Sequence, residues 1–181
     1  MRVIAGEWRG RPVDAPAGGS TRPTSDRARE GLFSMLASRV GTFEGLHVAD
    51  LFAGTGALGI EALSRGAAHC TFVENDRSAI EMLKRNIARF SAEARADIRS
   101  QGVEYASPPL RACDILLLDP PYAQGLAAMA LARVANPVWV APGGLLSVET
   151  DGETLGTPQG FAVEAERRFG KAHITLLRRE D

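Results

Sequence analysis

The sequence predicts an α/β domain with a doubly wound, mostly parallel sheet, closed by an antiparallel hairpin at its C-terminal end. Two observations carry this prediction. Short apolar runs alternate with segments of helical periodicity through the middle of the chain, as in folds where helices connect parallel strands. Residues 161–178 instead alternate around Gly170, which is typical of two antiparallel strands joined by a tight turn. With 181 residues, the chain is long enough for one domain with a sizeable core.

The N-terminal part is predicted to stand apart from the sheet. Residues 2–14 alternate enough for a short hairpin, with Gly6 and Gly10 as turn points. Residues 15–23 are rich in proline and glycine, so we expect a loop there.

A helix is predicted to open the main domain. Thr24 or Ser25 can cap its first turn, and the helical period continues to about Val40. The face that we expect to be buried carries Ala28, Leu32, Met35 and Leu36. The chain is thus divided into an N-terminal arm, residues 1–23, and a main domain, residues 24–181.

The remaining elements follow in alternation. Strands are predicted at residues 46–50, 70–74, 96–99, 114–118 and 145–149. The helices between them are predicted at residues 57–65, 77–90 and 125–135. Parallel strands present their carboxyl ends at one edge of the sheet, so the residues that follow the strands are the first candidates for a binding site.

The tetrad Asp119-Pro120-Pro121-Tyr122 directly follows one of these strands. Its two prolines forbid continuation as strand or helix, so the chain must turn there and hold an acid, rigid carbonyl groups and an aromatic ring together. This set suits a flat base that carries an exocyclic amine. Asp119 and the Pro120 carbonyl can each accept one N–H, and Tyr122 can stack on the ring. Considered alone, the tetrad is explained equally well as a plain proline turn after a core strand.

A second motif, residues 48–59, is typical of a strand, a glycine loop and a helix start. Glycines let a ligand approach the backbone closely, and a helix N-terminus favours partial negative charge. The loop satisfies the G-x-G-x-x-G pattern of dinucleotide sites through Gly54, Gly56 and Gly59. However, Asp50 lies where the strand passes into the loop, and an acid there suits a cationic, amine-bearing ligand better than a pyrophosphate. Glu74 ends the next strand, where an acid typically binds ribose hydroxyls.

Together these motifs resemble the S-adenosylmethionine-dependent methyltransferases that act on exocyclic amines of bases. The tetrad is shared by enzymes that modify adenine N6, cytosine N4 and guanine N2. Two N-terminal segments, residues 2–12 and 21–27, narrow the resemblance to the bacterial family that methylates guanine N2 in small-subunit (16S) ribosomal RNA, at guanine 966. The resemblance covers nearly the whole chain.

The resemblance implies a Rossmann-like class I methyltransferase fold with S-adenosylmethionine as the cofactor. It assigns cofactor binding to Asp50, Phe52, Gly54, Gly56, Glu74, Asn75, Gly102, Val103 and Asp119. It assigns catalysis to Asp119, Pro120 and Tyr122. The family usually has an acid near the cofactor adenine after the third strand. Here that stretch is Ser100-Gln101-Gly102-Val103, which leaves the backbone N–H of Val103 as the contact.

The arginines indicate where RNA would bind, although the formal net charge is only -1. All basic residues except Lys84 and Lys171 are arginine, which suits bidentate phosphate contacts. We expect the N-terminal cluster to contact RNA, and the residues predicted to bind the substrate are Arg9, Arg11, Arg22, Pro121 and Tyr122. A second cluster comprises Arg167, Arg168, Lys171, Arg178 and Arg179. For any single arginine, a charged strand edge is the simpler explanation.

Three other functions fit parts of the sequence. A methyltransferase acting on adenine N6 or cytosine N4 of RNA or DNA would keep the chemistry. The DNA enzymes usually carry an added recognition domain, for which 181 residues leave no room. A nicotinamide-dependent oxidoreductase would explain G-x-G-x-x-G but not the tetrad. A non-catalytic RNA-binding module is disfavoured because Asp119 and Tyr122 are both intact.

Composition sets the remaining expectations. Cys70 and Cys113 are predicted to be buried thiols, and His47, His69 and His173 lack the spacing of metal ligands. No apolar run is long enough to span a membrane, and the N-terminus lacks the apolar core of a signal peptide. We therefore expect a cytoplasmic monomer that binds 16S ribosomal RNA within a small-subunit particle and needs neither a metal nor a membrane.

Overall fold

The computed structural model describes residues 1–15, 26–123, 125–136 and 138–181. In these residues seven strands form one sheet in the order β3-β2-β1-β4-β5-β7-β6. The strands are β1 (His47–Leu51), β2 (His69–Glu74), β3 (Ala96–Ser100), β4 (Cys113–Leu118), β5 (Val140–Thr150), β6 (Phe161–Phe169) and β7 (Ala172–Arg179). β1 to β5 run parallel, and β7 pairs antiparallel with both β5 and β6. The predicted doubly wound sheet with its closing hairpin is confirmed.

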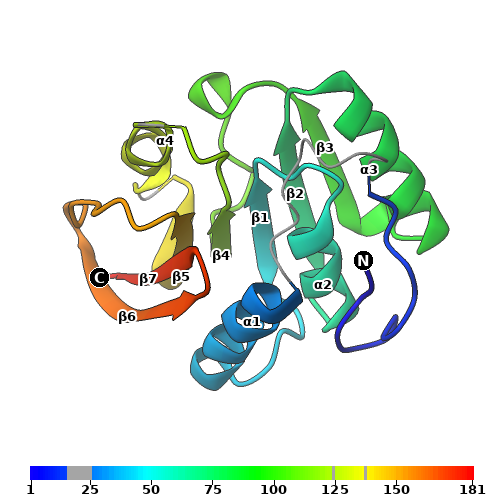
Figure 1. The fold of residues 1–181 in the computed structure, drawn as a ribbon, viewed down its shortest axis with the longest axis horizontal. Helices are drawn as coiled ribbons and strands as arrows, with labels where there is room; N and C mark the ends of the chain where they lie inside the picture. Colours follow the sequence, from blue (N-terminus) through cyan, green and yellow to red (C-terminus); the bar gives the residue numbers. More distant parts are fainter. Residues whose placement is uncertain (16–25, 124, 137) are drawn as a thin grey trace.

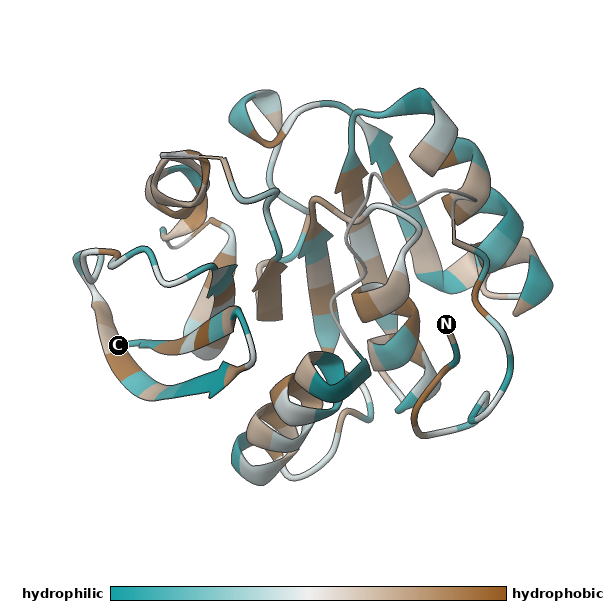
Figure 2. Ribbon diagram, in the orientation of Figure 1, coloured by the Kyte–Doolittle hydropathy of each residue, from teal (hydrophilic) through white to brown (hydrophobic). Residues whose placement is uncertain are grey.

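The helices cover the two faces of this sheet (Figure 1). α1 (Asp26–Val40), α2 (Ala57–Ser64) and α3 (Arg77–Arg89) bury their apolar residues in one core cluster. α4 (Leu126–Val134) and the short 3-10 helix η2 (Val103–Tyr105) contribute to a second cluster on the opposite face. A further 3-10 turn, η1 (Glu93–Arg95), precedes β3. Figure 2 shows the apolar character of the central strands, as expected for strands covered on both faces.

The strand β5 is longer than the sequence predicted. It begins at Val140 rather than near residue 145, and Gly143 and Gly144 lie inside it. The prediction stopped at this glycine pair because glycine weakens a strand interior. In the structure, the pairing of β4 with β5 shifts register between Cys113 and Ile115, and the strand continues through this irregularity.

Residues 1–15 fold back on themselves without forming strands. The predicted hairpin is reduced to one isolated bridge between Arg2 and Pro12, although Gly6 and Gly10 do turn the chain with positive φ. Three side chains of this segment are buried in the core shared by α1, α2 and α3, namely Val3, Trp8 and Val13. The segment runs beside α2 and α3 (Figure 1). The predicted caps Thr24 and Ser25 and the boundary at residue 23 lie outside the described residues.

The backbone of this segment is held by polar side chains of two helices. The buried carboxylate of Glu61 accepts hydrogen bonds from the Ile4 and Ala5 N–H groups at 2.8 and 3.0 Å. The Ser64 hydroxyl accepts one from Trp8 N–H at 3.0 Å, and Asn86 accepts one from Asp14 N–H at 2.9 Å. Residues 1–15 are therefore part of the same folded unit as the helices that they contact.

Among the helices of the described residues, none combines the length and the apolar character that crossing a membrane requires.

Candidate active site

The centre of the sheet contains the point where the winding reverses. β1 and β4 are neighbours, and their last paired residues are Leu51 and Leu118. After β1 the chain continues into α2 on one face, whereas after β4 it continues into α4 on the other face. Ligands of open α/β sheets bind in the crevice that this divergence creates. Phe52 directly follows β1, and Asp119 directly follows β4. Both residues therefore lie where ligands bind in open α/β sheets.

The glycine loop between β1 and α2 adopts left-handed backbone conformations. Phe52 has a φ of 63°, which is strained for an aromatic residue, and Gly54 and Gly56 have φ values of 55° and 86°. A side chain on Gly56 would collide with Leu83, so this glycine is also required by packing. A Cβ on Gly54 would meet no atom within 4 Å, so the loop backbone faces open space at this position. A ligand can approach the chain there without meeting a side chain.

The carboxylate of Glu74 ties this loop to the end of β2. It accepts hydrogen bonds from the N–H groups of Gly54 at 2.7 Å and of Asn75 and Asp76 at 2.8 Å each. Such bonds to a charged acceptor fix the loop and the strand end relative to one another. Gln101 N–H donates to the Glu74 carbonyl at 3.0 Å, which brings the segment with Gly102 and Val103 to the same edge of the sheet.

Asp50 is a buried acid below the loop. Its side chain is 1% exposed, and it accepts a hydrogen bond from Gly59 N–H at 2.8 Å. Burial, helped by the nearby negative charges of Asp119 and Glu74, raises the pKa of Asp50 to about 7 against the lowering effect of the Gly59 bond. Asp50 of β1, Glu74 of β2 and Asp119 after β4 thus lie near one edge of the sheet, called the acid edge below. Their negative charge favours a cationic ligand.

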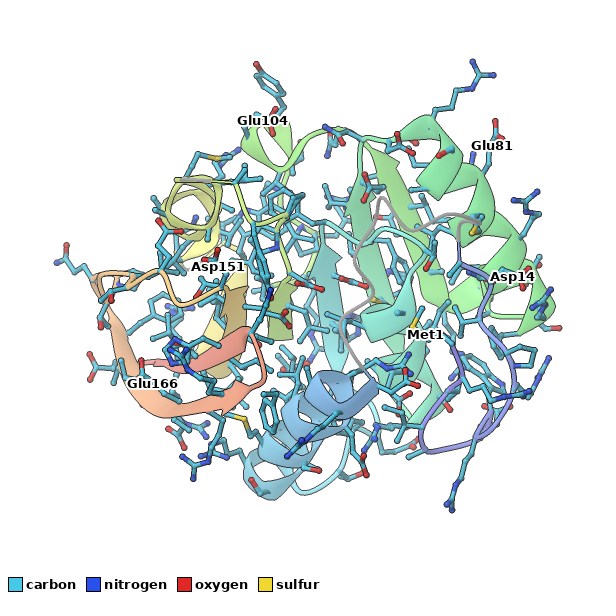
Figure 3. All side chains as sticks on the ribbon, in the orientation of Figure 1. Met1, Asp14, Glu81, Glu104, Asp151 and Glu166 are labelled. Atoms are coloured by element: carbon cyan, nitrogen blue, oxygen red, sulfur yellow. The ribbon has the colours of Figure 1, made fainter. Side chains whose placement is uncertain are left out.

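The tetrad turns away from β4 beside a hollow of roughly 370 Å³. This hollow is lined by Pro120, Pro121, Tyr122, Ala123, Ala127, Glu149, Thr150, Asp151 and Glu153. The Tyr122 hydroxyl donates a hydrogen bond to Glu149 Oε1 at 2.8 Å, so the ring is held from its far end. Figure 3 shows Asp151 near the end of β5, at the rim of this region. The hollow adjoins the acid edge but is built from a different loop.

Sequence reasoning missed Glu149. It is 6% exposed and lies near the end of β5, as Glu74 does in β2. An acid at the carboxyl end of a predicted parallel strand was the available signal. The prediction from sequence applied it to Asp50, Glu74 and Asp119 but not to Glu149.

Two of the predicted RNA-binding arginines, Arg9 and Arg11, lie on the N-terminal segment that packs beside α2 and α3. Arg9 is exposed on the N-terminal segment. Arg11 donates from Nη2 to the Arg89 carbonyl at 2.7 Å and lies 4.7 Å above the Phe90 ring, so it also has a structural role. Arg22 lies outside the described residues.

The cysteines and histidines contribute no metal centre to the part of the chain described. Cys70 and Cys113 are buried free thiols, as predicted. No group of three His, Cys, Asp or Glu side chains suited to a metal ion occurs within residues 1–15, 26–123, 125–136 and 138–181.

Comparisons with known proteins place this geometry in a family. A family model described as "Conserved hypothetical protein 95" matches residues 1–178. Ribosomal RNA small subunit methyltransferase D of Escherichia coli is 35% identical over 182 aligned residues, which cover 99% of this chain and 90% of the relative. The chain belongs to the small subunit methyltransferase D family. The Haemophilus influenzae member is also 35% identical, over 94% of this chain and 89% of its own length.

Solved structures confirm the class I methyltransferase fold. A structure described as a methyltransferase from Escherichia coli superposes with a TM-score of 0.87 at 35% identity, covering 99% of this chain and 98% of that one. TrmN from Thermus thermophilus has the same fold at 20% identity, with a TM-score of 0.69 over 84% of this chain and 48% of its own.

Membership of this methyltransferase family implies S-adenosylmethionine as the methyl donor. The residues present fit that cofactor. The acid edge suits its positive charge, the open space at Gly54 leaves room beside the loop backbone, and Glu74 stands where ribose hydroxyls would bind.

Proposed function

We propose that this protein transfers a methyl group from S-adenosylmethionine to the exocyclic N2 amine of a specific guanine in 16S ribosomal RNA. The observation that carries the proposal is the tetrad, which follows β4 at the reversal point of the sheet, beside the acid edge and a hollow lined by Tyr122. Relatives named as small subunit ribosomal RNA methyltransferases, matched over nearly the whole chain, support the substrate class. Within that family, we propose the site at guanine 966 as the target.

Asp50, Phe52, Gly54, Gly56, Glu74, Asn75, Gly102, Val103 and Asp119 are proposed to hold the cofactor. When bound, the cofactor supplies an electrophilic methyl group on a sulfonium, which is the difficult part of the chemistry. The protein supplies orientation and electrostatics.

Asp119 and Pro120 are proposed to orient the amine. Its nitrogen lone pair is delocalised into the guanine ring, which makes the amine a poor nucleophile. Hydrogen bonds from its two N–H groups to the Asp119 carboxylate and the Pro120 carbonyl favour a pyramidal nitrogen with a localised lone pair. Asp119 then accepts the proton that the nitrogen loses as the new bond forms. Tyr122 stacks on the base, which must leave any helical stack to enter the hollow.

The N-terminal arm, residues 1–23, is proposed to contact the RNA backbone and to help place the target. Arg9 is exposed on this arm, as a phosphate contact requires. Phosphate contacts of this kind position a partner without reading its sequence.

Methyl transfer in vitro tests the proposal. Purified protein and labelled S-adenosylmethionine are incubated with small-subunit particles, with naked 16S ribosomal RNA and with DNA. We expect label in the RNA of at least one of the first two substrates, recovered as N2-methylguanosine, and none with the Asp119→Ala variant. Label recovered as a methylated adenine or cytosine would overturn the proposed target base.

A further inference from the structure

The structure places a second carboxylate next to Asp119. β4 and β5 are parallel neighbours, and Leu118 pairs with Val148. Asp119 and Glu149 each follow that pair by one residue. Because neighbouring strands lie about 4.8 Å apart, the backbones of the two acids lie side by side at this edge of the sheet. Glu149 lines the hollow together with Pro120 and Tyr122.

Glu149 differs in its surroundings from the other acids of the hollow. It is 6% exposed and accepts the Tyr122 hydroxyl at 2.8 Å, whereas Asp151 is exposed at the rim. Burying a carboxylate costs free energy that only good hydrogen-bond donors offset. A carboxylate has about four acceptor positions, so the bond from Tyr122 does not by itself use up the acceptor capacity of Glu149.

The chemistry of the bases gives this second acid a use. In guanine the ring atom beside the N2 amine is N1–H, a donor. In adenine the atom beside the N6 amine is N1, and in cytosine the atom beside the N4 amine is N3; both are acceptors. A carboxylate accepts an N–H and repels an acceptor lone pair, so one acid can both attract guanine and reject the other two bases.

We propose that Glu149 is the residue that selects guanine, because its carboxylate accepts the N1–H of the target while Asp119 and the Pro120 carbonyl accept the N2 amine. The bond from Tyr122 holds the Glu149 carboxylate and the stacking ring in one arrangement. This inference rests on the proposed function and adds the specificity determinant to it.

A purely structural role for Glu149 makes a different prediction. If Glu149 only positioned the Tyr122 ring, its replacement would slow the reaction on every base that can enter the hollow by the same factor. The ratio of rates between two such bases separates the two roles.

The test uses RNA in which the target guanine is replaced by 2-aminopurine. This analogue keeps the 2-amino group but has an acceptor at N1. For the wild-type protein we expect kcat/KM on guanine to exceed that on 2-aminopurine by about 100-fold or more, since sites built for a hydrogen bond reject analogues that lack it. Equal rates on the two substrates would overturn the proposal without any variant.

Glu149→Gln then exchanges an acceptor for a donor at constant size. Its amide carbonyl can still accept from Tyr122, and its NH₂ can donate to N1 of 2-aminopurine. We expect the guanine preference to fall by about tenfold or more. Glu81→Gln, on an exposed face of α3 away from the hollow, is the control and should leave the ratio within about twofold.

Tyr122→Phe completes the comparison. It removes the bond between the two side chains, so it should slow both substrates while the ratio still favours guanine. An unchanged ratio in Glu149→Gln, with both substrates slowed equally, would assign Glu149 a positioning role and overturn the proposal. If the wild-type protein methylates adenine or cytosine instead of guanine, the proposed function itself fails, and the selection of guanine fails with it.

Discussion

At the scale of single residues, Asp50 lies in the candidate active site and also makes the stability of the protein depend on pH. The ordinary pKa of an aspartate is 3.8, and burial raises that of Asp50 to about 7. Between these two values the folded protein binds a proton that the unfolded chain does not bind. The contribution of Asp50 to the free energy of unfolding is therefore complete below pH 3.8 and is lost as the pH rises through 7.

Replacing Asp50 with asparagine should remove this pH dependence. The variant keeps an oxygen that can accept from Gly59 but cannot become charged. Between pH 5 and pH 8, the free energy of unfolding measured with urea should fall by on the order of 2–4 kcal/mol more in the wild type than in Asp50→Asn. Asp151→Asn, which alters an exposed acid, should behave as the wild type does. Equal pH dependence of stability in Asp50→Asn and the wild type would contradict the raised pKa of the buried Asp50 carboxyl.

Asp119 is expected to act on the target rather than on folding. Asp119→Ala should abolish methyl transfer. Cofactor affinity, measured by calorimetry, should stay within a few-fold of the wild type, because the other residues proposed to hold the cofactor are unchanged. Tyr122→Ala should instead weaken RNA binding as well as rate, because stacking on one base contributes about 1–3 kcal/mol. Near-normal turnover in Asp119→Ala would refute its role.

At the scale of elements, the buried acid on α2 connects the N-terminal segment to the domain. Glu61 accepts the Ile4 and Ala5 N–H groups and pairs with Arg65 at 2.8 Å. Removing it leaves buried donors without an acceptor and Arg65 without its pair, so Glu61→Ala should cost about 2–4 kcal/mol of stability.

The control lies on α3. Glu81 pairs with Arg77 on an exposed face, at 3.5 Å. Glu81→Ala should change stability by less than about 0.5 kcal/mol, since exposed pairs contribute little. Similar losses in the two variants, measured by urea unfolding, would show that the N-terminal segment is not anchored through Glu61.

The prediction about RNA binding concerns the N-terminal arm, residues 1–23. Arg9, Arg11 and Arg22 changed together to alanine should weaken RNA binding and flatten its salt dependence, while cofactor affinity stays the same. Arg11→Ala alone should also lose about 0.5–1 kcal/mol of stability, because its guanidinium lies over Phe90. Normal methylation by the triple variant at physiological salt would move the RNA surface to another place, with Arg167, Arg168 and Lys171 as the next candidates.

At the scale of the whole molecule, the sequence predicted the sheet, and the edge of the sheet at which the glycine loop and the tetrad lie, because both depend on local patterns. Apolar runs, the glycine loop and the double proline each constrain the backbone on their own. The contact between Tyr122 and Glu149 joins residues far apart in the chain, so no local pattern predicts it. The anchoring of residues 1–15 is of the same kind, since an acid within a helix such as Glu61 is ordinarily solvated.

In residues 1–15, contacts with distant parts of the chain override a local sequence pattern. Its alternation predicted a hairpin, but burial of Trp8 and Val13 against the helices decides its shape, and only one bridge forms. Tertiary packing overrides a short β pattern, because such a pattern is stable only where a partner strand or a core supports it.

The central claim is that one guanine of 16S ribosomal RNA receives a methyl group on N2 from this protein. Mass mapping of 16S ribosomal RNA from a strain that lacks the protein tests it most directly. We predict that one N2-methylguanosine disappears, returns with the wild-type gene and does not return with Asp119→Ala. A 16S ribosomal RNA with every methylated guanine unchanged in the deletion strain would contradict the claim.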